Sequence, residues 1–308
     1  HKSAANSAWL TAPAVCLKGL ERIMGSSEVK AHAGVCTWMN GIFWLRTVEP
    51  VGRGKVRIEN WSDVGKIKVD QVATVIEENL VFPLMRGRDV HRWTARPSTH
   101  ILLTQDPATR TGITEATMKR QLPLTYQYLR HFEQPLRTRS GYRKYFDPSK
   151  DAFWTIYNVG EYTLAPFRVA FKELTDFFQC AVVPASSKAI VPDTKLRFID
   201  CQSQGEAYFL CGLLNSSPAL LYLYSTATWV QTADYQASDI SRIAIPAFQQ
   251  SDQNHQLIAD LAEQCHTAAA AGDERKVGDL EAELDDELAK LWRIGAGEMR
   301  AIKDAILD

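Results

Sequence analysis

The residues best placed to do chemistry are cations that gather in the middle of the chain. The first cluster has four arginines within eleven residues, namely Arg86, Arg88, Arg92 and Arg96. The second, in the segment RTRSGYRKYF, contains Arg137, Arg139, Tyr142, Arg143 and Lys144. Guanidinium and ammonium groups neutralise phosphates, and interleaved aromatic rings can stack on bases. Both clusters therefore predict contact with DNA.

Each cluster also has a structural interpretation. Arg88 and Asp89 could form an ion pair that orients a turn, and the tyrosines of the second cluster could pack on a sheet beside a solvated loop turned by Gly141. Three weaker candidates are Lys188 in PASSKA and Trp229 with Gln231 in STATWVQTADY. Glutamine can pair with adenine and lysine with guanine, although either residue is more often plain surface.

Catalytic, cofactor and metal motifs are missing from the pattern. The two G-x-G spacings, Gly52/Gly54 and Gly295/Gly297, do not follow a strand and open a helix, as a nucleotide cofactor requires. The D-x-K tripeptide at Asp193 has no clear acidic partner upstream and is typical of a turn. Six cysteines without a C-x-x-C pair suggest neither zinc nor disulfides. We therefore expect no catalytic residue, no bound cofactor and no metal.

Charge is distributed unevenly along the 308 residues. Residues 82–150 carry 13 Lys and Arg against 5 Asp and Glu, whereas residues 251–308 carry 6 against 14. The chain begins without a Met or a signal-peptide pattern, so we expect it to start inside a larger polypeptide. No apolar run approaches the ~18 residues that a bilayer requires, and the cysteine usage suits a reducing cytoplasm.

The elements that must position the cations mix strands and helices, which predicts an α+β fold. A β-rich region is expected from residue 33, with a hairpin turn at Asn40-Gly41 and with Trp38, Phe43 and Trp44 in its core. Further strands are predicted at 56–60, 66–69, 100–104, 153–157, 166–170, 180–183 and 196–200. Helices are predicted at 12–24, 116–137 and 206–224, and Asn215 is expected to cap the end of its helix. An antiparallel helical hairpin is predicted after Pro246, followed by a short helix at 297–307.

Several segments, in order, resemble the C-terminal half of adenine-N6 DNA methyltransferases of restriction-modification and phage-defence systems. They are AHAGVCTWMNGIFWL (31–45), PLMRGRDVHRW (83–93), FWTIYNVGEYTLAPFRVAFKEL (153–174), YFLCGLLNSSP (208–218) and DISRIAIPAF (239–248). Two positions depart from the family pattern: His32 replaces the usual Arg, and Arg168 the usual Lys. The catalytic N-P-P-Y type of motif of that family is absent, because the chain contains no Pro-Pro pair.

The resemblance implies a target-recognition domain without its catalytic half. Residues 1–24 would be a lead-in from the missing catalytic domain, 25–250 the recognition domain and 251–308 an acidic helical hairpin that lies away from DNA. The function implied is sequence-specific binding of double-stranded DNA that presents an adenine to an N6-methyltransferase domain, in cis or in trans, where S-adenosylmethionine would bind. Two alternatives remain open: a free-standing specificity subunit, and a protein-interaction module of a defence complex.

Overall fold

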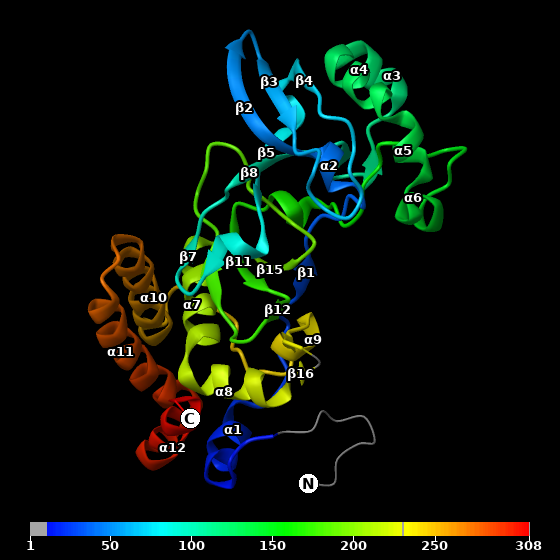
Figure 1. Ribbon diagram of the computed structural model, residues 1–308. Coiled ribbons are helices and arrows are strands. Elements are labelled where there is room, and N and C mark those ends of the chain that lie inside the picture. Colours follow the sequence, from blue (N-terminus) through cyan, green and yellow to red (C-terminus); the bar gives the residue numbers. More distant parts are fainter. Residues whose placement is uncertain (1–10, 230, 308) are drawn as a thin grey trace.

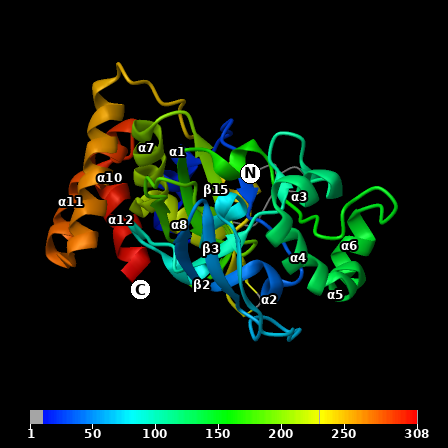
Figure 2. The same ribbon diagram turned by 90° about the horizontal axis from the view of Figure 1, so that it is seen from above.

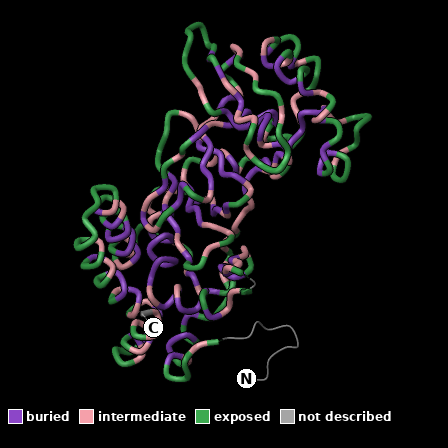
Figure 3. Tube along the Cα trace, viewed as in Figure 1, coloured by how far each residue is buried: buried purple, intermediate pink, exposed green. Residues whose placement is uncertain are grey.

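The expected α+β class is confirmed by the computed structural model, which describes residues 11–229 and 231–307. The first ten residues of the predicted lead-in lie outside the described part. The molecule is elongated, with two parts that lie one above the other in Figure 1. Figure 3 shows buried segments running through both parts, which corresponds to two large hydrophobic clusters with a small third cluster.

The upper part is built on a six-stranded sheet. In spatial order its strands are β14 (Val191–Pro192), β5 (Val81–Met85), β8 (Thr99–Leu102), β2 (Trp44–Gly52), β3 (Lys55–Asn60) and β4 (Ala73–Glu77). Only the β14–β5 pair is parallel. Five short helices complete this part: α2 (Asn40–Phe43), α3 (Glu115–Gln121), α4 (Pro123–His131), α5 (Glu133–Thr138) and α6 (Ser140–Tyr145). Phe43 and Trp154 are fully buried in its core.

Small elements connect these units. They are the 3-10 turns η2 (Glu78–Leu80), η3 (Gly87–Asp89) and η4 (Glu161–Leu164), and the two-residue strands β6 (Val90–His91), β7 (Thr94–Ala95), β9 (Gln105–Asp106) and β10 (Thr111–Gly112). Strand β6 pairs with β7, and β9 pairs with β10.

The hairpin turn of the upper sheet is at Arg53-Gly54, not at Asn40-Gly41 as the sequence suggested. Gly52 pairs with Lys55, and both intervening residues have positive φ (55° and 68°), as a two-residue hairpin turn requires. Asn40 instead begins α2, where its side-chain oxygen accepts a hydrogen bond from the Thr37 hydroxyl (2.5 Å). The predicted hairpin at Asn40 was therefore wrong.

Two other local predictions were wrong for identifiable reasons. Residues 153–157 form no strand, because side chains donate hydrogen bonds to the backbone carbonyls that a neighbouring strand would need. Thr104 donates to the Trp154 carbonyl, and Arg139 donates to the carbonyls of Phe153 and Thr155. Residues 66–69 form a loop, whereas strands β4 and β5 were not expected. The single helix expected at 116–137 is three helices, because Pro123 lacks the N–H needed to continue α3 and instead begins α4.

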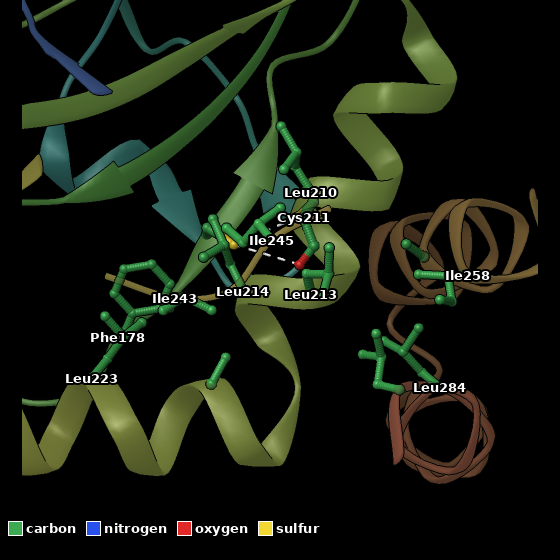
Figure 4. Packing of buried hydrophobic residues seen from close by; sticks show 14 of the residues in the cluster. Phe178, Leu210, Cys211, Leu213, Leu214, Leu223, Ile243, Ile245, Ile258 and Leu284 are labelled. Carbon is green, nitrogen blue, oxygen red and sulfur yellow. Dashed lines mark hydrogen bonds between the residues drawn. The ribbon is translucent and has the colours of Figure 1, made fainter. Parts of the chain in front are cut away.

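The lower part combines an antiparallel sheet with helices. Its sheet contains, in order, β1 (Ala31–Ala33), β15 (Leu196–Cys201), β11 (Phe167–Lys172) and β13 (Cys180–Val182). The helices of this part are α1 (Leu17–Ile23, preceded by the 3-10 turn η1, Ala14–Cys16), α7 (Gln204–Asn215), α8 (Ser217–Thr226) and α9 (Ala237–Ile240), of which α7 packs on β11, β13 and β15 and α9 on β1. A smaller sheet holds β12 (Leu174–Thr175), β17 (Ala233–Asp234) and β16 (Thr228–Trp229). Figure 4 shows the core at α7, with Cys211 and Leu214 among buried aliphatic side chains.

The predicted helical hairpin is present as α10 (Gln253–Ala271) and α11 (Glu274–Trp292), followed by α12 (Ala296–Leu307). Gly212 of α7 lets α10 approach closely, since an added Cβ would lie 3.3 Å from Ala262. Asp285 of α11 is buried and accepts hydrogen bonds from the backbone N–H (2.9 Å) and hydroxyl (2.6 Å) of Ser217. The hairpin lies on the side of the molecule opposite α3–α6 in both Figure 1 and Figure 2.

Two further features bear on the class of protein. Among residues 11–229 and 231–307, no helix combines the length and the apolar character that crossing a membrane would need. All six cysteines are free thiols, and Cys180 and Cys211 approach to 3.7 Å between sulfur atoms.

Asn215 does not cap α7 in the expected way; its side chain binds the backbone of Cys180 in β13.

The imidazole of His266 joins α10 to β13 and should make stability depend on pH. Its Nε2 accepts from the Val182 N–H (2.9 Å), its Nδ1 lies 2.8 Å from the Ala262 carbonyl, and burial lowers its pKa to about 4. Because the unfolded imidazole has a pKa near 6.5, the unfolded state binds the proton first. Its stabilisation is therefore complete above pH 6.5 and is lost as pH falls towards 4.

The free energy of unfolding should decrease as the pH falls from 6.5 to 4. We predict that His266→Gln will make this decrease smaller by up to about 3 kcal/mol. Urea titrations of both proteins over this range measure the difference. Asp193, whose pKa burial raises to about 6, acts in the opposite direction, since its protonation as pH falls from 6 to 4 favours the folded state. Comparing variant with wild type cancels that contribution. Parallel curves for the two proteins would refute the role given to His266.

Candidate nucleic-acid interface

The first predicted cluster divides between the interior and the surface. Arg86 is buried, lies 4.7 Å from the centre of the Trp61 ring, donates to the Ser98 hydroxyl (2.7 Å) and lies 3.6 Å from the Asp89 carboxylate. The ion pair that orients the turn is thus Arg86–Asp89, not Arg88–Asp89. Arg88 is exposed and has no ion pair within the described part of the chain. Arg86 is therefore a structural residue, whereas Arg88 remains a candidate for DNA contact.

The other two arginines of this cluster lie next to the terminal hairpin. Arg92 donates to the Asn215 carbonyl (2.7 Å) and pairs with Glu281 of α11, which also accepts from the Trp93 indole (2.5 Å). Arg96 is exposed and makes a long contact, 3.4 Å, with the Ala270 carbonyl at the end of α10. The expectation that Arg92 binds DNA is corrected accordingly, because its guanidinium is held by Glu281 and the Asn215 carbonyl, whereas Arg96 stays a candidate because it is exposed and has no ion pair within the described residues.

The second predicted cluster forms two short helices, α5 and α6, where a loop was expected. Arg139 is 2% exposed, and its guanidinium donates to four backbone carbonyls, those of Leu136, Thr37, Phe153 and Thr155, at 2.7–3.0 Å. Burial lowers its pKa to about 10. Tyr142 is also fully buried and donates to the Asp151 carbonyl (2.6 Å). Both are therefore structural residues and leave the candidate interface.

Three cations of this cluster remain on the surface. Arg137 is paired with Glu133 (2.8 Å) and lies 5.0 Å from the Phe153 ring centre. Arg143 and Lys144 are exposed on α6 and have no ion pair among residues 11–229 and 231–307. The Lys144 ammonium lies 5.0 Å from the centre of the Tyr145 ring. Arg143 and Lys144 are therefore free to meet phosphates.

The weaker candidates are separate from this surface. Lys188 donates to the carbonyls of Glu78 (2.6 Å) and Asn79 (3.1 Å) and covers the Phe82 ring, so its charge stabilises the β4–β5 connection. Its partial burial lowers its pKa. Trp229 and Gln231 are exposed in the lower part, where the Trp229 ring meets Tyr224 at 4.9 Å. The structure does not bring them together with α6.

Sequence reasoning missed three cations on the β2–β3 hairpin. Arg53, at the turn, and Lys55 and Arg57, on β3, are exposed and have no ion pair within the described residues. Figure 1 and Figure 2 both place this hairpin in the same part of the molecule as α2–α6. The segment GRGKVR carried the signal, because its cations alternate with small or apolar residues and begin at a turn. It precedes the basic segment that the charge count emphasised.

The glycine and carboxylate motifs have structural roles. Gly52 and Gly54 flank the tip of the β2–β3 hairpin, and Gly295 and Gly297 lie where α11 gives way to α12, so neither pair forms a strand–turn–helix cradle. Asp193 lies in the expected turn, which the Leu196 N–H closes by donating to its carbonyl (2.8 Å). Across the described ranges, no three His, Cys, Asp or Glu side chains gather as metal ligands.

An aromatic cluster adjoins the two free cations of α6. The Trp38 ring stacks on Tyr145 (centres 5.6 Å apart, planes at 11°), and Tyr145 stacks on Tyr157 (5.2 Å, 23°). Phe146 meets Trp38 edge-on at 6.2 Å. The backbone of Trp38 has a φ of 52°, a left-handed conformation that is strained for a bulky residue. The sequence predicted Trp38 as core, whereas the structure leaves it half-buried beneath two exposed tyrosines.

Comparison with known proteins shows a fold relationship. No known protein family matches the sequence, and no curated protein matches it. Among solved structures, the chain is similar to the Type IIL restriction-modification enzyme MmeI in complex with DNA, with a TM-score of 0.57 and 10% identity over 92% of this chain. A likeness to the type IIG restriction endonuclease BpuSI has a TM-score of 0.36 at 12% identity, over 69% of this chain and 26% of that one. The chain spans 36% of the MmeI chain, so it shares its fold with about a third of that enzyme.

Proposed function

We propose that this chain is the DNA-recognition domain of a restriction-modification type of adenine-N6 methyltransferase. It binds double-stranded DNA at a specific sequence and positions a target adenine for a catalytic domain outside this sequence, fused to it or separate, where S-adenosylmethionine binds. The observation that carries the proposal is the set of exposed, unpaired cations in the upper part of the molecule. They include Arg53, Lys55, Arg57, Arg88, Arg143 and Lys144.

Charge placement supports a single DNA-binding side. Affinity for duplex DNA comes mainly from cations that meet phosphates, and a cation already paired with a carboxylate contributes little to it. The acidic terminal hairpin, which phosphate would repel, lies on the opposite side from α3–α6 (Figure 2). Arg92 holds it there through its ion pair with Glu281. DNA would therefore approach the upper part of the molecule, which carries both the β2–β3 hairpin and α6 (Figure 1).

The fold likeness to MmeI supports the proposed DNA-binding role. The similar region of MmeI belongs to a restriction-modification enzyme whose structure was solved in complex with DNA. In our proposal the hairpin and α6 contact phosphates and thereby fix register, and side chains between them read base edges in a groove. The domain makes no covalent step; it places the adenine so that the catalytic domain can take it out of the duplex.

One observation favours a second candidate, a protein-interaction module or specificity subunit of a defence complex. Four large apolar side chains are 45–65% exposed in the lower part, namely Leu174, Phe177, Tyr224 and Trp229. Phe177 and Tyr224 line a cavity of about 350 Å³ beside Arg92. Exposed apolar surface of this kind marks contacts with other proteins. Because it is distant from α6, this surface is compatible with the DNA-binding proposal.

The decisive experiment compares DNA binding by two double variants, each of which replaces two cations with alanine. Replacing Arg143 and Lys144 together with Ala should weaken binding to a short DNA duplex roughly tenfold and reduce the slope of log affinity against log salt by about 2, because two phosphate contacts disappear. Fluorescence anisotropy over a salt series measures both quantities.

The matched control replaces Arg275 and Lys276, two exposed cations at the start of α11, with Ala. It changes net charge equally on the opposite side and should leave affinity nearly unchanged. Equal weakening by both pairs would indicate a nonspecific charge effect, and no weakening by the α6 pair would remove α6 from the interface.

A further inference from the structure

The aromatic cluster next to α6 has the geometry of a stacking surface. Tyr145 and Tyr157 are 49% and 41% exposed, although large aromatic side chains usually bury most of their surface in a core. Their rings and that of Trp38 lie within 5.2–5.7 Å of one another, with Tyr145 nearly parallel to both neighbours. We call these three residues the aromatic platform.

The orientation of the rings selects a planar ligand. A cage for a methylated ammonium group needs rings that face one another around a central space. In the platform the rings stack on each other at 11° and 23°, so they fill that space and present flat outer faces. Phe146 closes one edge at 73° to Trp38. A flat, polarisable group such as a nucleobase stacks on such faces, with about 1–3 kcal/mol per base.

Charge beside the platform suits the phosphates that accompany a base. The Lys144 ammonium lies 5.0 Å from the Tyr145 ring centre, and Arg143 is exposed on the same helix. Two carboxylates lie nearby, Asp147 and Asp151, and Asp147 is paired with Lys150 (3.4 Å). With Arg143, Lys144 and Lys150 against these two carboxylates, the net local charge is positive.

The backbone is specialised to build this surface. Trp38 and Asn158, the neighbour of Tyr157, both have positive φ (52° and 59°). Gly141 of α6 lies flat against the Trp38 indole, since an added Cβ would lie 2.0 Å from two of its ring atoms. Strain of this kind costs about 1–3 kcal/mol per residue and concentrates at binding sites. One strained residue, Trp38, and a glycine contact thus converge on the platform, beside an asparagine that tolerates the left-handed conformation.

We infer that the aromatic platform binds an unpaired nucleobase of the DNA that the domain recognises, holding it by stacking on Tyr145 and Tyr157 while Arg143 and Lys144 neutralise its flanking phosphates. This inference rests on the proposed DNA-binding function and deepens it. In the proposed function cations bind the phosphates of the duplex, and here the aromatic platform binds an unstacked base. The platform thereby stabilises DNA that is locally opened.

The test compares a fully paired duplex with the same duplex carrying a central unpaired bulge. Wild-type protein should bind the bulged duplex roughly tenfold more tightly, in keeping with the stacking of one base. A 2-aminopurine placed in the bulge should lose fluorescence on binding, because stacking quenches it. Replacing Tyr145 and Tyr157 together with Leu should abolish both the preference and the quenching while leaving affinity for the paired duplex unchanged.

Two variants sharpen the test. Tyr145→Phe keeps the ring and should retain the preference, and Tyr224→Leu removes a tyrosine of similar exposure on α8 and should also retain it. A wild-type protein that binds both duplexes equally would overturn this inference alone, as would a Leu variant that keeps the preference. Failure to bind either duplex would overturn the proposed function as well.

Discussion

Replacement of Arg139 with methionine should lower the free energy of unfolding by about 3–5 kcal/mol. Its guanidinium joins three segments that are distant in sequence, because it donates to the carbonyls of Leu136, Thr37, Phe153 and Thr155. Methionine fills similar volume but donates nothing, so those carbonyls lose their charged donor inside the protein. Lysine would rescue little, since one ammonium cannot reproduce the planar fork. Urea denaturation followed by circular dichroism measures the loss.

Arg137→Met is the matched control. Arg137 lies two residues earlier, is exposed and has one surface ion pair, with Glu133, so its loss should cost less than about 1 kcal/mol. If both variants unfold at the same urea concentration as wild type, Arg139 does not organise this part of the fold. The comparison also shows why Arg139 must be excluded from DNA-binding tests: its replacement would weaken binding by unfolding the domain.

Gly141→Ala should destabilise the protein by about 1–3 kcal/mol and disrupt the aromatic platform. Helix propensity alone predicts the opposite sign, because alanine favours a helix by about 1 kcal/mol over glycine. The added methyl group would lie 2.0 Å from the Trp38 ring, so Trp38 or α6 must move. Thermal unfolding reports the sign directly.

Gly278→Ala provides the control for that substitution. Gly278 lies within α11, is exposed, and an added Cβ there meets nothing within 4 Å. It should therefore stabilise the protein by about 0.5–1 kcal/mol. If Gly141→Ala stabilises to the same extent, the close packing of α6 against Trp38 is refuted.

Local patterns predicted the parts of the fold that depend on local physics. The helical hairpin followed from apolar residues at spacings of three and four, and its helices end at Gly272 and Arg293 in left-handed conformations. Strands such as β3 and β11 followed from β-branched and aromatic residues. The prediction of a hairpin turn at Asn40-Gly41 was wrong because a tertiary contact fixes the local conformation: the Asn60 side chain donates to the Gly41 carbonyl (2.7 Å).

The candidate site was only partly predictable, because the sequence alone does not show whether an arginine side chain is buried or exposed. Arg139 and Arg143 are four residues apart, yet one holds backbone carbonyls in the interior and the other faces solvent. Their separation follows from α6 packing against Trp38, a contact across about a hundred residues that no local pattern encodes. The cations of the β2–β3 hairpin were missed because the charge count favoured density in sequence over position at a turn.

Selection of bound duplexes from a pool with a random central sequence, followed by affinity measurements across salt concentrations, tests the central claim most directly. Our account predicts that one sequence is enriched, that it binds at least about a thousandfold more tightly than random duplex, and that affinity falls steeply with salt. Enrichment of no sequence, together with affinity that salt hardly changes, would contradict the assignment of this chain as a DNA-recognition domain.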